Sequence, residues 1–125
     1  MLIKDVNRIE PFTAIDGCLI KEIIQPGNDL TSPGISLAQA ELAPGKATLP
    51  HRLDFLEIYF IMIGNGLMHV GEESAEVKPG QAIYIPPGEI QFIENLGSGL
   101  LTFLCVCHPG YDPGKDEVII NQVTP

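Results

Sequence analysis

Glycine and proline divide this sequence into short apolar runs, and that division limits the folds available to the chain. The 125 residues include 13 glycines and 11 prolines, and many of them stand together between stretches rich in apolar residues. These two residue types weaken helices and strand interiors but suit turns. No long segment carries apolar residues at the 3.6-residue spacing of an amphipathic helix. The pattern therefore predicts an all-β fold of short strands.

The apolar runs give the expected strands directly. They lie at residues 17–24, 35–42, 55–63, 67–70, 75–77, 81–85, 90–95 and 100–107. Many short strands joined by regular turns are typical of a β-sandwich or a β-barrel. A chain of this length has room for one domain. We therefore expect a single domain over residues 1–125, with a barrel core at about 17–107 between an N-terminal arm and a C-terminal tail.

Charge and hydropathy narrow the partners and the location. Seven basic residues against 16 acidic ones give a formal net charge of −9. That charge repels phosphate backbones and anionic lipids, so we expect neither a nucleic-acid partner nor a membrane partner. The longest apolar run, residues 58–63, is far shorter than the roughly 20 residues that span a bilayer. The first residues lack the pattern of a signal peptide, and three cysteines are too few for a disulfide framework. A cytoplasmic location is expected.

Glu57 is an acid within the most apolar of the expected strands. Strand alternation places it on the same face as Tyr59 and Ile61, with Ile58 and Phe60 on the opposite face. Both faces are otherwise apolar, so we expect the strand to be buried on both sides. A buried carboxylate is costly unless it has a partner. Glu57 is therefore the first candidate for a functional residue.

Two ordered sets of residues match a known pair of motifs. The first motif is G-x5-H-x-H-x(3,4)-E-x6-G, and its matching positions are Gly45, His51, Glu57 and Gly64. The second is G-x5-P-x-G-x2-H-x3-N, and its matching positions are Gly80, Pro86, Gly88 and Asn95. On these residues the sequence resembles the cupin superfamily. The resemblance implies a double-stranded β-helix, or jelly-roll, barrel for this chain.

The resemblance also implies a divalent metal ion, which would be Mn, Fe, Ni or Zn. Family members usually hold it with two histidines and a glutamate of the first motif and one histidine of the second. Here Leu53 and Gln91 occupy two of the histidine positions. Transfer by position leaves His51 and Glu57 as metal ligands, with the amide oxygen of Gln91 as a substitute third ligand. Such a set is weaker and harder than three imidazoles and a carboxylate. Asp54 falls on the opposite strand face unless a bulge intervenes.

Three functions remain open. The first is a metal-dependent isomerase, lyase or decarboxylase acting on a small polar compound, and Lys46 and Arg52 hint at an acidic ligand. A dioxygenase is less expected, because no facial triad of two histidines and a carboxylate is present. The second is a metal-free, sugar-modifying barrel in which Glu57, His51 and Tyr59 perform acid–base catalysis. The third is a non-catalytic barrel that binds a small ligand. A small barrel with exposed edge strands is also expected to form a homodimer.

Overall fold

The computed structural model of this protein describes residues 1–27, 29 and 34–119. Within these ranges the regular elements are strands and two short 3₁₀ helices, none of them a helix long and apolar enough to cross a membrane. In chain order the elements are η1 (Val6–Arg8), β1 (Phe12–Thr13), β2 (Leu19–Ile24), β3 (Ser36–Leu42), β4 (His51–Leu53), β5 (Leu56–Ile63), β6 (Gly66–Val70), β7 (Glu73–Val77), β8 (Ala82–Ile85), β9 (Gln91–Asn95), β10 (Leu101–His108), η2 (Pro113–Lys115) and β11 (Asp116–Val118).

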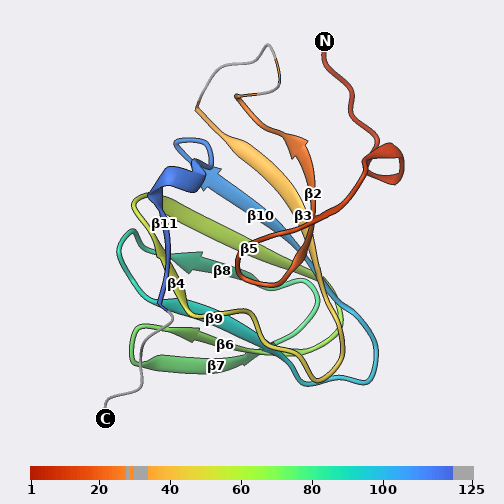
Figure 1. The fold of residues 1–125 in the computed structure, drawn as a ribbon. Coiled ribbons are helices and arrows are strands. Elements are labelled where there is room, and N and C mark those ends of the chain that lie inside the picture. Colours follow the sequence, from red (N-terminus) through yellow and green to blue (C-terminus); the bar gives the residue numbers. More distant parts are fainter. Residues whose placement is uncertain (28, 30–33, 120–125) are drawn as a thin grey trace.

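The strands form two antiparallel sheets. The larger sheet has the strand order β1-β2-β3-β10-β5-β8, and the smaller has the order β11-β4-β9-β6-β7. In Figure 1 the strands β2, β3, β10 and β5 lie above β4, β9, β6 and β7. Pairing of strands distant in sequence, such as β3 with β10, is typical of a jelly roll. The predicted all-β jelly-roll fold is therefore confirmed.

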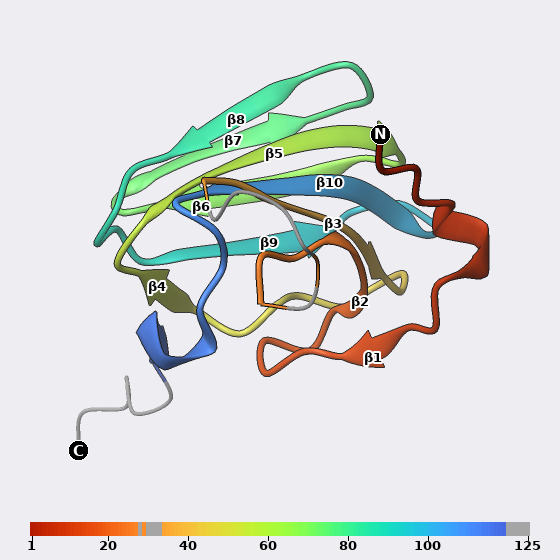
Figure 2. The same ribbon diagram turned by 90° about the horizontal axis from the view of Figure 1, so that it is seen from above.

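The predicted strands are all present, each within two residues of its expected bounds. The pattern missed β1, β4 and β11, because strands of two or three residues are too short to show an alternation. β1 belongs to the N-terminal arm and pairs with β2, and β11 belongs to the C-terminal tail and pairs with β4. The arm crosses in front of β10 and β5, as two views at right angles agree (Figures 1 and 2). Residues 120–125 of the expected tail lie outside the described residues.

The core lies between the sheets, and two motif residues shape the loops at its end. Asn95 is buried, and its Nδ2 atom donates to the carbonyl oxygens of Leu42 at 2.9 Å and Gly99 at 2.8 Å. Gly64 has a φ of +88°, and a Cβ atom there would lie 2.7 Å from the carbonyl oxygen of Leu100. Asn95 therefore ties the loop between β9 and β10 to the end of β3, and Gly64 lets the end of β5 lie close to Leu100. At these two motif positions, Asn95 and Gly64 therefore serve the fold.

The expectation that β5 is buried on both sides is wrong. Its inner residues Tyr59 and Ile61 are buried, but the side chains of Phe60 and Met62 on the other face are 39% and 46% exposed. Only the inner face of each sheet meets the other sheet in a two-layer fold, so the outer face of β5 has no covering layer within the described chain. Apolar side chains continue across the neighbouring strands on this face. We call this set the outer apolar face: Leu37, Ile58, Phe60, Tyr84, Leu104 and Val106.

Candidate functional site

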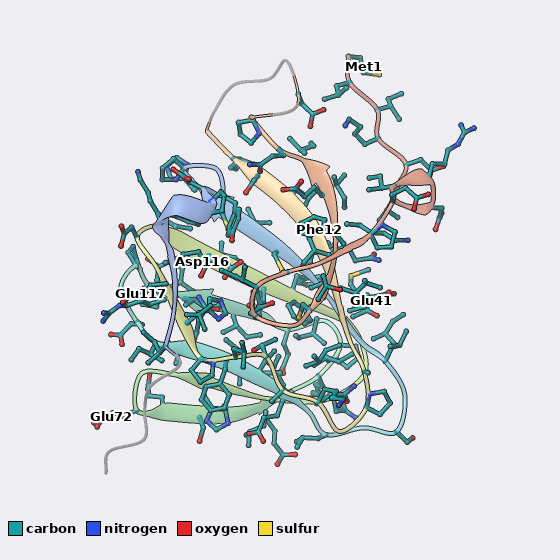
Figure 3. The ribbon with its side chains drawn as sticks, viewed as in Figure 1. Met1, Phe12, Glu41, Glu72, Asp116 and Glu117 are labelled. Carbon is teal, nitrogen blue, oxygen red and sulfur yellow. The ribbon has the colours of Figure 1, made fainter. Side chains whose placement is uncertain are left out.

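A cavity of about 90 Å³ lies inside the barrel. Apolar side chains and thiols form much of its wall, including Leu53, Phe103 and Cys105. Phe12 of β1 and Asp116 of β11, from opposite ends of the described chain, also line it, and Figure 3 labels both, Phe12 to the right of centre and Asp116 to the left. The arm and the tail thus complete a cavity that the barrel strands begin. Polar or ionisable groups on its wall belong to Asp16, Glu22, Gln25, Ser36, His51, Glu57, Tyr59, Tyr111 and Asp116.

His51 reaches the cavity from β4, one of the strands that the pattern missed. It is buried, and in the smaller sheet it pairs directly with Gln91 of β9. Its Nδ1 atom lies 2.9 Å from the carbonyl oxygen of Leu49. A carbonyl oxygen only accepts hydrogen bonds, so Nδ1 carries the hydrogen, and in the neutral ring Nε2 keeps a free lone pair. The backbone thereby sets which ring nitrogen of His51 can act as a base or an acceptor.

Glu57 lies on the inner face of β5 and lines the cavity, as its strand position predicts. Its Oε2 atom accepts from the Cys107 thiol at 3.5 Å, whereas the buried Oε1 atom has no hydrogen-bond partner among the described residues. Burial raises the pKa of Glu57 to about 8, although the neighbouring Cys107 and Gln91 side chains favour the charged form and act to lower it. Near pH 7 the carboxyl group is therefore mostly protonated.

Gln91 and Leu53 stand at the two histidine positions of the motifs. Gln91 is buried beside Glu57 but is not on the cavity wall, and its Oε1 atom is unpartnered within the described part of the chain. Leu53 does line the cavity, and it packs in a small apolar cluster with Phe55 and Cys107. Of the three expected metal ligands, the structure therefore brings His51 and Glu57 to the cavity and leaves Gln91 behind it.

Tyr59 shares the inner face of β5 with Glu57 and also lines the cavity. Its ring packs on Phe103 with centroids 4.5 Å apart, and burial raises the pKa of its hydroxyl group well above the usual range. A phenol in such surroundings keeps its proton. Tyr59 is therefore placed as part of the cavity wall rather than as a base.

Sequence reasoning missed three acids of the cavity wall: Glu22 of β2 and, in the arm and the tail, Asp16 and Asp116. Burial raises the pKa of Asp16, whose Oδ1 atom accepts from the backbone N–H of Cys18 at 3.0 Å. Asp116 accepts from the Tyr111 hydroxyl at 2.6 Å through Oδ2, and its buried Oδ1 atom has no partner in the described ranges. Asp16 and Asp116 also raise the pKa of Glu57 through charge repulsion. They come from the arm and the tail, where no motif marks them.

The sequence of this chain matches a known protein family and two known relatives. The family model described as "Cupin domain" matches residues 38–107, which is more than half of the chain. The chain belongs to the cupin family. An uncharacterized protein from Methanocaldococcus jannaschii is 38% identical over 116 residues, covering 92% of each chain. An oxalate-binding protein of Thermotoga maritima is 34% identical over 70 residues, which cover 55% of this chain and 58% of that protein.

Solved structures show the same cupin fold. A polyketide cyclase from Streptomyces resistomycificus has a TM-score of 0.80 at 18% identity, covering 96% of this chain and 86% of its own. A Bacillus subtilis oxalate decarboxylase with Mn(II) centres has a TM-score of 0.79 at 20% identity, covering 91% of this chain and 31% of its own. At these identities the likeness concerns the fold, because one fold hosts many activities.

The donor groups of this cupin do not fit the metal centre that the motifs imply. Among the described residues, no three His, Cys, Asp or Glu side chains stand together as a group that could hold one metal ion. Leu53 offers no donor, and Gln91 is not on the cavity wall. His51 and Glu57 remain as two protein donors, fewer than the three or four that hold a zinc ion in proteins. We therefore derive no chemistry through a metal ion.

Proposed function

We propose that this cupin binds a small polar molecule in the barrel cavity and moves a proton to or from it through Glu57, without a resident metal ion. The observation that carries this proposal is the position of Glu57. Its carboxyl group is buried on the cavity wall, and its Oε1 atom has no partner among the described residues. A buried polar atom without a partner is costly, and ionisable groups in such surroundings concentrate at catalytic sites.

The neighbours of Glu57 support a division of roles. A carboxyl group with a pKa near 8 can act as an acid or a base close to neutral pH. His51 presents Nε2 as a hydrogen-bond acceptor, because Leu49 holds the other ring nitrogen. Tyr59 and Phe103 supply an apolar wall. This arrangement suits proton transfer at a carbon next to a carbonyl group: the ionised carboxyl group takes the proton from one carbon and returns it to the neighbouring carbon or to oxygen.

A deuterium-exchange experiment tests proton transfer directly. Hydroxyacetone and glycolaldehyde are small enough to serve as probes, and both carry C–H bonds next to a carbonyl group. In D₂O we expect the wild-type protein to speed the loss of these C–H signals, as followed by proton NMR. Glu57→Gln should lose about 100-fold or more of that acceleration, which is the usual contribution of a general base.

Glu94→Gln is the matched control for that experiment. Glu94 carries the same functional group on β9, but its side chain points away from the core and pairs with His69 at 2.6 Å. It should exchange the probes like the wild type. Equal exchange rates for the wild type and Glu57→Gln would refute proton transfer by Glu57. Binding of the probes in the cavity without exchange would favour the alternative function, a barrel that only binds its ligand.

A second proposal concerns the assembly of the chain as a homodimer through the outer apolar face. Val106 lies between Leu37 and Ile58 in the sheet, and Phe60 and Tyr84 stand on the neighbouring positions. None of the six residues of this face is charged, although the chain carries a net charge of −9. A second copy of the same face would meet it without charge repulsion and would cover its aromatic side chains, as an isologous interface requires.

Sedimentation equilibrium measures this assembly. We expect twice the chain mass for the wild type, and the chain mass for Phe60→Asp at the same concentration, because the substitution buries like charges on both sides of a two-fold axis. Leu96→Asp is the matched control, since Leu96 is a half-exposed apolar residue in the turn after β9. It should remain dimeric. A monomeric wild type at micromolar concentration would contradict the proposal.

A further inference from the structure

Acidic residues outnumber basic ones on the cavity wall. Asp16, Glu22 and Asp116 line it together with Glu57, which is mostly protonated near pH 7, whereas no lysine or arginine among the described residues lines it. The two cations that hinted at an acidic ligand lie elsewhere: Lys46 is exposed in a turn, and Arg52 donates from Nε to Glu117 at 2.7 Å on the surface. The hint of an acidic ligand is therefore not supported, because nothing in the cavity offsets the negative charge of an anion.

Two free hydrogen-bonding atoms on the wall, Asp116 Oδ1 and His51 Nε2, are acceptors. Asp116 Oδ1 is buried and has no partner in the described part of the chain, and a carboxylate oxygen only accepts. In the neutral ring, His51 Nε2 is also an acceptor. Glu57 Oε1 is equally unpartnered, on a side chain that is 7% exposed, and it can accept or donate according to its protonation. A bound molecule that satisfies Asp116 Oδ1 and His51 Nε2 must therefore supply hydrogen-bond donors.

The acceptors are spread around the cavity rather than gathered at one point. No three of the described acid, thiol and imidazole groups could share a metal ion, so a bare cation would leave most of them unpaired. The apolar part of the wall, with Leu53, Phe103 and Cys105, suits a carbon skeleton instead. A volume of about 90 Å³ limits that skeleton to a few non-hydrogen atoms.

We infer that the cavity takes a compact organic molecule that carries no negative charge and donates hydrogen bonds, such as a short hydroxyaldehyde or hydroxyketone. A short polyol or a small amine in its ammonium form supplies the same donors without the carbonyl group and serves as a non-reacting probe. The cavity excludes small carboxylates, oxalate included, in contrast to the relative from Thermotoga maritima that is named for binding oxalate. This inference rests on the proposed function for the location of the binding site. It adds the chemical class of the ligand.

Binding is measured on the wild-type protein, with a chelator present, by NMR titration with ethanolamine, ethylene glycol and oxalate. We expect the two donor molecules to shift the amide resonances of cavity residues such as Cys18, Glu57 and Cys107. Oxalate should leave those resonances in place. Cavity shifts with oxalate at the concentrations that suffice for ethanolamine would overturn the inference, as would an absence of cavity shifts with both donor molecules.

Two substitutions on the same strand sharpen the test. Asp116→Asn removes the negative charge and replaces one acceptor oxygen by a donor, so we expect the affinity for ethanolamine to fall about tenfold or more. Glu117→Gln makes the same change of charge one residue along β11, where the side chain is exposed and pairs with Arg52. It should bind like the wild type. Unchanged affinity in Asp116→Asn would contradict the inference.

The two proposals can fail separately. Cavity binding of ethanolamine without deuterium exchange of the carbonyl probes would retain the ligand class and remove proton transfer by Glu57. Exchange of the carbonyl probes that oxalate inhibits competitively would retain proton transfer and remove the ligand class. Circular dichroism of each variant verifies that the fold is intact before either comparison is made.

Discussion

The double substitution Leu53→His/Gln91→His is expected to turn this barrel into a tight metal-binding protein. Leu53 lies two residues after His51 on β4, so both side chains point to the same face, and residue 91 pairs directly with His51. Together with Glu57, the variant would hold three imidazoles and a carboxylate, which is a donor set that divalent transition metals favour. Adding two ligands should raise the affinity for Zn²⁺ or Mn²⁺ by more than about 100-fold, since even indirect neighbours of a metal contribute 10–100-fold.

Equilibrium dialysis followed by elemental analysis measures this gain, and a rise in the melting temperature with added Zn²⁺ provides a second readout. The two single variants should each bind more weakly than the double variant. Replacing Glu57 by alanine in the double variant should remove most of the gained affinity. If the double variant folds but binds no more Zn²⁺ than the wild type, these four positions do not converge, and the assignment of the site is wrong.

The motif positions of this chain show why the barrel fold could be predicted from the sequence while the metal centre could not. A turn residue such as Gly64 is required by the backbone, because any Cβ atom there meets the carbonyl oxygen of Leu100. The alternation of Gln91, Ile93 and Asn95 toward the core is also a property of the strand alone, and β9 shows it. A metal centre depends instead on every donor being present. Leu53 alone removes one metal donor, even though the other motif residues keep the expected spacing.

The acids of the arm and the tail mark the limit of local patterns in this chain. Asp16 precedes a glycine in a turn, and Asp116 begins a strand of three residues, so neither stands in a periodic segment. Asp16 lies in the turn between β1 and β2, and Asp116 reaches the cavity through the long-range pairing of β11 with β4. Nothing in the residues next to Asp116 encodes that pairing. His51 was identified only through its motif position, because β4 is too short to show a period.

The substitution Glu57→Gln is expected to change how stability depends on pH. In the folded protein, burial raises the pKa of Glu57 to about 8. In the unfolded chain we take the pKa of an exposed glutamate, which is 4.5. Below pH 4.5 the group is protonated in both states. Between 4.5 and 8 the unfolded chain releases this proton while the folded chain keeps it, so unfolding becomes easier as pH rises. Above pH 8 both states are ionised, and the contribution levels off.

The slope of this decline is at most about 1.4 kcal/mol per pH unit, so several kcal/mol separate the two ends of the range. Glutamine keeps the shape of the side chain and cannot ionise. The variant should therefore match the wild type most closely near pH 4.5 and exceed its free energy of unfolding by a margin that grows up to pH 8. Urea unfolding at fixed protein concentration, from pH 4.5 to 9, measures both curves.

Glu76→Gln supplies the control for these curves, because the exposed side chain of Glu76 on β7 should leave the pH dependence of the wild type in place. Parallel curves for the wild type and Glu57→Gln would mean that Glu57 ionises normally in the folded protein. The cavity would then be open to water, because burial is the main cause of the raised pKa. A growing margin would instead show that folding keeps a neutral acid inside the barrel at a cost in stability, as expected where a side chain is retained for its chemistry.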